Sequence, residues 1–126
     1  MPKIKLIVDD AEINIKLASR YLEQYNFEIL TATGGKACVE LVKNNKIDLI
    51  FLDKMMPGMD GIATIKALKA LGIPIPPIVA LTANTFDGSK ETYLQEGFNE
   101  YLNKPIVFRE LNKIVIKYFG DKDGEY

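Results

Sequence analysis

The chain has 126 residues, of which 48% are hydrophobic and 26% charged, and its 16 basic and 17 acidic side chains give a net charge of −1. This size and composition are typical of one globular domain, which we expect to span residues 1–126 with a flexible polar tail over 120–126. The balanced charge gives no support to nucleic-acid binding or to a membrane-surface role.

The residue types that are missing restrict the chemistry further. The chain contains no histidine and one cysteine, Cys38. This excludes Ser-His-Asp and Cys-His catalysis, an internal disulfide, and zinc sites built from histidines or several thiolates. We expect Cys38 to be a small buried hydrophobic residue. No apolar run approaches the ~20 residues that span a bilayer, and no signal peptide is recognisable, so we expect no membrane insertion and a cytoplasmic location.

Five short apolar runs alternate along the chain with longer segments of helical periodicity. The expected strands are residues 4–8, 28–32, 48–52, 78–81 and 100–102. The first, third and fourth runs are almost wholly apolar, as expected of strands buried on both faces, whereas the second and fifth are more polar. The alternation predicts an α/β fold, namely a (βα)5 doubly wound, flavodoxin-like parallel sheet of five strands with the order 2-1-3-4-5.

Apolar residues at helical spacing mark the faces with which the helices cover this sheet. They are Ile15, Ala18, Leu22 and Tyr25, then Ile62, Ile65 and Leu68, and finally Phe108, Leu111, Val115 and Tyr118. The helix expected over residues 86–96 has few apolar anchors, so we expect it to be the least rigid element.

Polar residues interrupt the apolar pattern where the strands end. Asp9 and Asp10 follow the first strand, Asp53 the third, Thr82 the fourth and Lys104 the fifth. The carboxyl ends of parallel strands meet at one edge of a sheet, so we expect these side chains to lie together. Three carboxylates ~4 Å apart would repel one another by roughly 4 kcal/mol per pair at an effective dielectric constant of ~20. Lys104 and a divalent cation can offset this repulsion, and Mg²⁺ fits a site of two or three carboxylates and waters.

This set of residues indicates phosphoryl chemistry. A carboxylate beside Mg²⁺ and a lysine can attack phosphorus, because the cations offset the charge on the phosphoryl oxygens. In this interpretation Asp53 is the nucleophile, Asp9 and Asp10 hold the metal, Thr82 donates a hydrogen bond, and Lys104 pairs with the phosphoryl group. One acid at a strand end is most often a solvated loop residue, but that explanation does not account for five such placements at one edge.

Four segments of the sequence resemble the motif blocks of response-regulator receiver domains, which act in two-component signalling. They are LIVDD at 6–10, LDKMMPGMDG at 52–61, ALTA at 80–83 and NKP at 103–105. The resemblance runs from about residue 3 to residue 119. It implies that Asp53 accepts the phosphoryl group and that Asp10 is a direct Mg²⁺ ligand, assisted by Asp9. It further implies that the backbone carbonyl of Met55 is a ligand of the same ion.

The resemblance also implies a switch. In the family, the hydroxyl at the position of Thr82 moves toward the phosphoryl group, and an aromatic residue at the position of Tyr101 turns inward behind it. The peptide bond Lys104–Pro105 is expected to be cis, as is usual in the family. In the family, the side chains at the positions of Met55 and Asn84 tune the lifetime of the phosphoryl group, and the resemblance implies the same for this chain.

The implied function is a signalling phosphoacceptor domain rather than an enzyme. The donor would be a histidine kinase or a histidine phosphotransfer protein, since this chain has no histidine of its own. The motifs are most similar to those of receivers in phosphorelays or fused to hybrid kinases, although Lys54 and Ala11 stand where many such receivers carry histidine and asparagine. A second apolar row on the first helix, Ile13, Leu17 and Tyr21, either docks the donor or reflects a broadly buried helix.

Three alternatives share the expected architecture. A flavodoxin-type flavin-binding protein would need a phosphate-binding loop after the first strand, where this chain carries acids instead. A Mg²⁺-dependent phosphatase that forms an aspartyl phosphate would need a second acid two positions beyond Asp53, where Met55 stands. A receiver-like module that binds partners without phosphorylation usually has an incomplete site, whereas this site is complete.

Overall fold

The computed structural model, which describes residues 3–83 and 90–123, contains one parallel sheet of five strands in the order β2-β1-β3-β4-β5. The strands are β1 (Lys3–Val8), β2 (Phe27–Ala32), β3 (Leu49–Asp53), β4 (Ile78–Thr82) and β5 (Glu100–Asn103). Each strand begins and ends within one residue of its predicted bounds. The predicted fold class and strand order are therefore confirmed.

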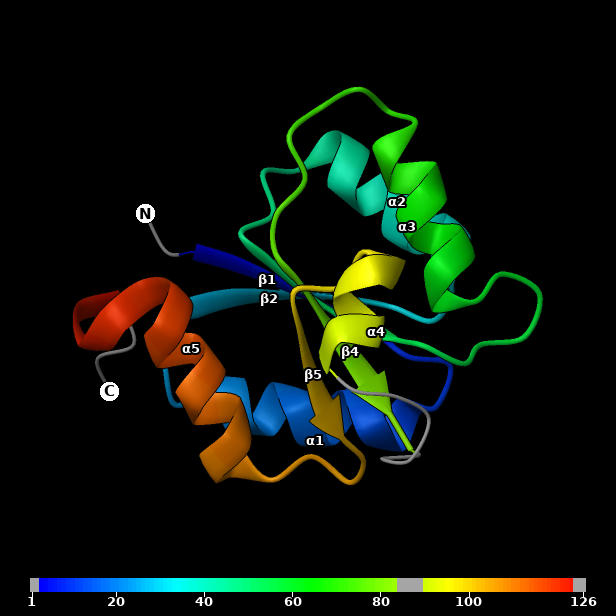
Figure 1. Ribbon diagram of the computed structural model, residues 1–126. Coiled ribbons are helices and arrows are strands. Elements are labelled where there is room, and N and C mark those ends of the chain that lie inside the picture. Colours follow the sequence, from blue (N-terminus) through cyan, green and yellow to red (C-terminus); the bar gives the residue numbers. More distant parts are fainter. Residues whose placement is uncertain (1–2, 84–89, 124–126) are drawn as a thin grey trace.

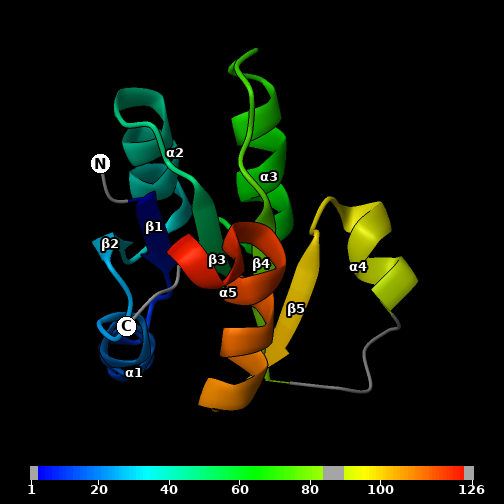
Figure 2. The ribbon, with the colours of Figure 1, turned by 90° about the vertical axis from the view of Figure 1, so that its left-hand side faces the viewer.

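Helices cover both faces of the sheet (Figures 1 and 2). They are α1 (Glu12–Leu22), α2 (Gly35–Asn44), α3 (Gly61–Lys69), α4 (Lys90–Glu96) and α5 (Phe108–Asp123). The first part of the helix expected over 86–96 lies outside the described residues. α5 extends past a break at Gly120, where φ is 69°, into the expected tail, whose last residues, 124–126, are also not described. None of the described helices is long and apolar enough to cross a membrane.

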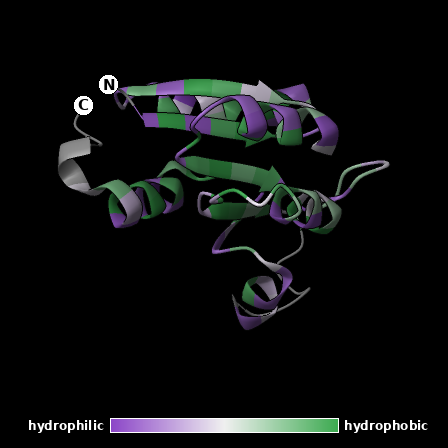
Figure 3. Ribbon diagram, turned by 90° about the horizontal axis from the view of Figure 1, so that it is seen from above, coloured by the Kyte–Doolittle hydropathy of each residue, from purple (hydrophilic) through white to green (hydrophobic). Residues whose placement is uncertain are grey.

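Two apolar layers lie on opposite faces of the sheet. Leu6 and Leu52 belong to the layer that packs against α2 and α3, whereas Ile7 and Phe51 belong to the layer under α1 and α5. This division follows from the pleat, since successive strand residues point to opposite faces. β3 and β4 are buried along their whole length, and the edge strands β2 and β5 are more exposed. The hydrophobic colour of the central strands in Figure 3 shows the same division.

The single cysteine lies inside the layer that faces α2. Cys38 is completely buried, and burial raises the pKa of its thiol from 9.0 to about 12. The prediction that it is a buried hydrophobic residue is confirmed.

The segment between β3 and α3 is held in place by its backbone geometry. Gly58 has a φ of 81°, in the left-handed region that favours glycine. Asp60 then caps α3, because its Oδ1 accepts a hydrogen bond of 2.8 Å from the N–H of Ala63. A Cβ atom at Gly61 would lie 2.9 Å from the carbonyl oxygen of Asp53, so only glycine allows this close approach. The chain thus turns sharply after Asp53, and at Gly61 it comes back close to the backbone of Asp53.

One charged residue of β1 lies in the interior, where the sequence analysis expected an almost wholly apolar strand. Lys5 is completely buried, and its Nζ lies 3.7 Å from the ring centre of Phe27 and 3.6 Å from that of Phe119. An ammonium over aromatic faces is stabilised by a cation–π interaction. Because Phe119 lies near the end of α5, this contact holds the end of the chain's last helix against β1 and β2.

Candidate functional site

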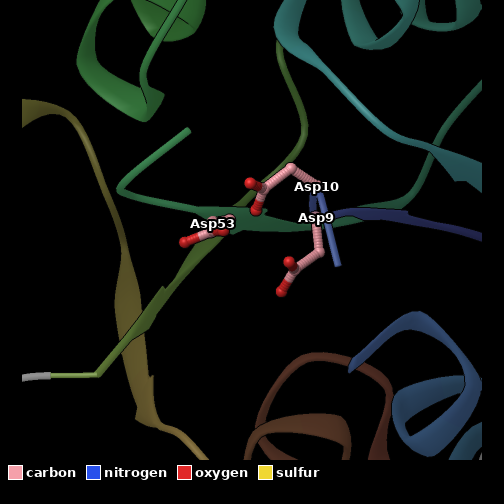
Figure 4. A group of neighbouring side chains, drawn as sticks. All are labelled: Asp9, Asp10 and Asp53. Atoms are coloured by element: carbon pink, nitrogen blue, oxygen red, sulfur yellow. The ribbon is translucent and has the colours of Figure 1, made fainter. Parts of the chain in front are cut away.

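Three carboxylates meet at the carboxyl edge of the sheet. Asp9 follows β1, Asp10 comes next, and Asp53 ends the neighbouring strand β3. Each offers a carboxylate oxygen, and the three oxygens lie within 4.8 Å of one another (Figure 4). Asp9 and Asp53 are only 0% and 2% exposed, whereas Asp10 is exposed. The predicted convergence of these acids is confirmed.

The predicted lysine joins this cluster from β5. The Nζ of Lys104 lies 3.1 Å from Oδ2 of Asp9 and 3.0 Å from Oδ1 of Asp53. The backbone N–H of Lys104 donates a hydrogen bond of 2.8 Å to the carbonyl of Thr82, which is buried at the end of β4. The peptide bond Lys104–Pro105 is cis, as the resemblance implied. All five residues predicted from strand ends therefore lie along one edge.

The environment of Asp53 disfavours its charged form. The pKa of Asp53 is raised from 3.8 to about 6, mainly by burial and also by the charge of Asp9, although Lys104 and a hydrogen bond from the N–H of Met55 act in the opposite direction. That N–H lies 3.1 Å from Oδ1 of Asp53. For Lys104, burial disfavours the charge, but the hydrogen bonds and charges of Asp53 and Asp9 outweigh burial and raise the pKa.

The acidic cluster fits a hard divalent cation. Oδ2 of Asp53 is buried and has no hydrogen-bond partner within the described part of the chain. A buried carboxylate oxygen without a partner is unfavourable, and the ammonium of Lys104 is shared between Asp9 and Asp53. Mg²⁺ prefers oxygen ligands and needs only one or two carboxylates beside its waters. The side chains of Asp9, Asp10 and Asp53 are therefore suitable for a magnesium ion.

Comparison with known families identifies the kind of domain to which this edge belongs. A family model described as the response regulator receiver domain matches residues 6–116. The chain belongs to this family. It is therefore a receiver domain of two-component signalling, a phosphoacceptor class rather than a class of catalytic enzymes. Family membership decides against the flavin-binding protein and the phosphatase.

Individual relatives support the finer resemblance. The sensor protein GacS of Pseudomonas syringae pv. syringae is 39% identical over 119 residues, which cover 91% of this receiver domain and 13% of that protein. The chain thus spans a small part of the length of this curated relative. The receiver domain of the sensor histidine kinase PA1611 of Pseudomonas aeruginosa PAO1 has a TM-score of 0.80 and 28% identity, covering 95% of this chain and 99% of that chain. The expected similarity to receivers of sensor kinases is confirmed.

Two solved structures also contain ligands or partners of interest. The PA1611 receiver was crystallised with a magnesium ion coordinated in its active site cleft. The receiver domain of the Saccharomyces cerevisiae response regulator Ssk1 was crystallised with the histidine phosphotransfer signalling protein Ypd1. The Ssk1 structure has a TM-score of 0.85 and 26% identity, and the match covers 97% of this receiver domain and 92% of that chain.

The remaining predicted residues that the structure describes differ in how exposed they are. Tyr101 is on β5 and is 39% exposed, with its ring stacked on that of Tyr93. On α1, Ile13 is 73% exposed, whereas Leu17 and Tyr21 are half-buried against the core. The interpretation of this row as part of a broadly buried helix is therefore wrong for Ile13, whereas it agrees with the partial burial of Leu17 and Tyr21. Asn84 lies outside the described residues.

One contact of this receiver was not anticipated from the sequence. Lys54 directly follows Asp53 and was noted only as a departure from related receivers. In the structure its ammonium pairs with Glu96 of α4 at 3.1 Å. Lys54 lies in the motif block at 52–61, but Glu96 is far away in the sequence and belongs to no motif, so no sequence signal connects the two residues.

Proposed function

We propose that this receiver accepts a phosphoryl group on Asp53 from a phosphohistidine donor in a Mg²⁺-dependent reaction, and that this event changes its surface around Tyr101. The observation that carries the proposal is the position of the Asp53 carboxylate. It is buried, contacts the ammonium of Lys104 at 3.0 Å, and lies in an acidic cluster suited to a cation.

The side chains of the edge have separate roles in this proposal. Asp9, Asp10 and Asp53 would hold the metal with the backbone carbonyl of Met55, and bound Mg²⁺ supplies positive charge that offsets the charge of phosphoryl oxygens. An oxygen of Asp53 forms a bond to phosphorus as the phosphorus–nitrogen bond of the donor breaks, and the donor's imidazole nitrogen keeps the bonding electrons.

Lys104 and Thr82 act on the transferred group. Lys104, already charged and held between two carboxylates, presents its ammonium to the incoming phosphoryl oxygens as a point charge. Thr82 ends β4 beside β3 and donates its hydroxyl hydrogen bond to a phosphoryl oxygen. Its movement in that direction would leave space behind it for the ring of Tyr101, which is on the neighbouring strand.

The surface around the edge is suited to a protein donor. Three apolar side chains that follow the site residues are exposed: Ile13 at 73%, Met55 at 75% and Val107 at 52%. A surface groove of about 490 Å³ along α1 includes Ile13 and Leu17. Exposed apolar groups around a polar centre are typical of protein interaction sites. We propose a histidine phosphotransfer protein or a histidine kinase as the partner, in line with the partner of the Ssk1 receiver.

The acceptor residue is tested by mass spectrometry of the intact chain. Incubation with acetyl phosphate and Mg²⁺ should add one labile phosphoryl group to the wild-type protein, and chelation of Mg²⁺ should suppress the reaction. Asp53→Asn should remain unmodified. Glu40→Gln, which makes the same chemical change at an exposed position of α2, should react like the wild type.

Two results would count against this function. A wild-type chain that gains no adduct would favour the phosphorylation-independent binding module. An adduct that persists in Asp53→Asn would assign the acceptor role to another residue.

A further inference from the structure

The side chain of Lys54, the residue after β3, contacts α4 and not the acidic cluster. Its Nζ lies 3.1 Å from Oε1 of Glu96 and 4.8 Å from the ring centre of Tyr93. The side chains of Lys54 and Glu96 are 15% and 24% exposed, so solvent screens this pair less than an ordinary surface pair. The ammonium is thus held by a carboxylate and by the face of an aromatic ring.

The backbone of Lys54 is fixed to the strands of the site. Its N–H donates to the carbonyl of Leu81 at 3.1 Å, and its carbonyl accepts from the N–H of Gly61 at 3.0 Å. The backbone of Lys54 is therefore attached to the end of β3, which carries Asp53. The side chain of the same residue contacts α4, so Lys54 connects the end of β3 to α4.

Tyr93 extends the connection to the exposed face of β5. Its ring is 2% exposed and stacks on Tyr101, with 5.1 Å between the ring centres and 21° between the ring planes. Phe98 packs against the same ring edge-on, at 6.3 Å and 77°. The hydroxyl of Tyr93 is buried and has no hydrogen-bond partner among the residues described in the structure. A buried hydroxyl without a partner contributes less to the stability of this ring stack than a hydrogen-bonded one.

We propose that Lys54 is a positioning residue that couples the state of Asp53 to Tyr101 through Glu96 and Tyr93. The proposal rests on the proposed function, because it concerns how a phosphoryl group on Asp53 affects the Tyr101 surface. Lys54 contacts Glu96 and Tyr93, and Tyr93 contacts Tyr101, so the contacts are contiguous from the end of β3 to β5. Coupling between two sites is reciprocal, so a change in the Tyr93–Tyr101 stack also changes the free energy of ligand binding at the acidic site.

The proposed coupling from Lys54 to Tyr101, called the relay below, is tested on the full chain with fluorine NMR. Tyrosine is replaced throughout by 3-fluorotyrosine, and the signal of Tyr101 is assigned with Tyr101→Phe. Mg²⁺ with beryllium fluoride, a mimic of the phosphoryl group, is added to saturation. Lys54→Met removes the charge but keeps most of the stem, Lys54→Arg keeps the charge, and Lys66→Met is the control on an exposed face of α3.

We expect the Tyr101 signal of the wild type to move when the mimic binds. Lys54→Met should reduce this movement by at least about twofold, while Lys54→Arg restores it and Lys66→Met leaves it unchanged. An undiminished response in Lys54→Met would overturn the proposal. So would a fixed Tyr101 signal in a wild type that has bound the mimic.

Binding at the acidic site is followed separately by the backbone amide of Met55, which contacts Asp53. If that amide does not respond in the wild type, the proposed function fails rather than the relay. In that case the relay is tested by comparing the Tyr101 signals of the ligand-free variants. In them, Lys54→Met should displace the Tyr101 signal more than Lys66→Met does, and an equal effect of the two variants would refute the proposal.

Discussion

Replacement of the buried Asp53 by asparagine should stabilise the metal-free protein at neutral and alkaline pH. Burial and the charge of Asp9 raise the pKa of Asp53 from 3.8 to about 6. At about 1.4 kcal/mol per pKa unit, this difference corresponds to about 3 kcal/mol of destabilisation by the ionised carboxylate. Asparagine has nearly the same shape without the charge, and Lys104 can still pair with Asp9.

Because the pKa of Asp53 is higher in the folded chain than in the unfolded chain, the stabilisation by Asp53→Asn depends on pH. Below pH 3.8, the acid is protonated in both the unfolded and the folded chain, so the wild type carries no charge penalty. As pH rises from 3.8 to about 6, the unfolded chain loses its proton first and the wild type loses stability. Above that range both states are ionised and the whole penalty is present. The advantage of Asp53→Asn should therefore grow from near zero at low pH to about 3 kcal/mol at high pH.

Urea unfolding in the presence of EDTA, followed by circular dichroism at several pH values, measures this difference directly. Glu40→Gln is the control, because it removes an exposed carboxylate and should change the free energy of unfolding very little at any of these pH values. An Asp53→Asn variant that is no more stable than the wild type at high pH, or whose advantage is independent of pH, would refute the electrostatic argument.

Four further predictions concern other parts of the domain. Ile13→Glu should slow phosphoryl transfer from a histidine phosphotransfer protein but not from acetyl phosphate; equal loss of both, measured by intact mass, would exclude a docking role. Gly61→Ala should lower the free energy of unfolding in urea by about 1–3 kcal/mol, because its Cβ would press on the carbonyl of Asp53. Cys38 should resist thiol reagents in the native protein at pH 8 and react fully in urea, since it is buried and the pKa of its thiol is about 12. Mg²⁺ at about 100 times its Kd should raise the free energy of unfolding by about 2.7 kcal/mol, and Asp10→Asn should remove most of this gain in thermal unfolding.

The acidic edge could be predicted because the prediction required only the positions of the strands and their parallel direction. Apolar runs located the strands, and the first polar residues after them, such as Asp9, Asp53 and Lys104, had to meet if the strands were parallel. It was harder to predict from the sequence which residues of a helix are buried. Periodicity placed Ile13 and Leu17 in one row, but the burial of each depends on how α1 is tilted on the sheet.

Contacts between charged and aromatic groups from distant segments were not predictable. A lysine in a strand, such as Lys5, is usually exposed, because burial of its ammonium is costly. Its burial depends on two aromatic rings that different elements supply at the right distance. The pair of Lys54 and Glu96 likewise depends on where α4 sits, which no local pattern determines.

The burial of Lys5 between Phe27 and Phe119 has a consequence for how the domain can be connected to others. Through this contact the end of α5 lies beside the start of β1 (Figure 1), so the chain enters and leaves the domain on the same side. The acids lie at the other end of β1. A neighbouring domain attached at either terminus therefore leaves the acidic edge open, and a circular permutant with the termini joined by a short linker should retain that edge intact.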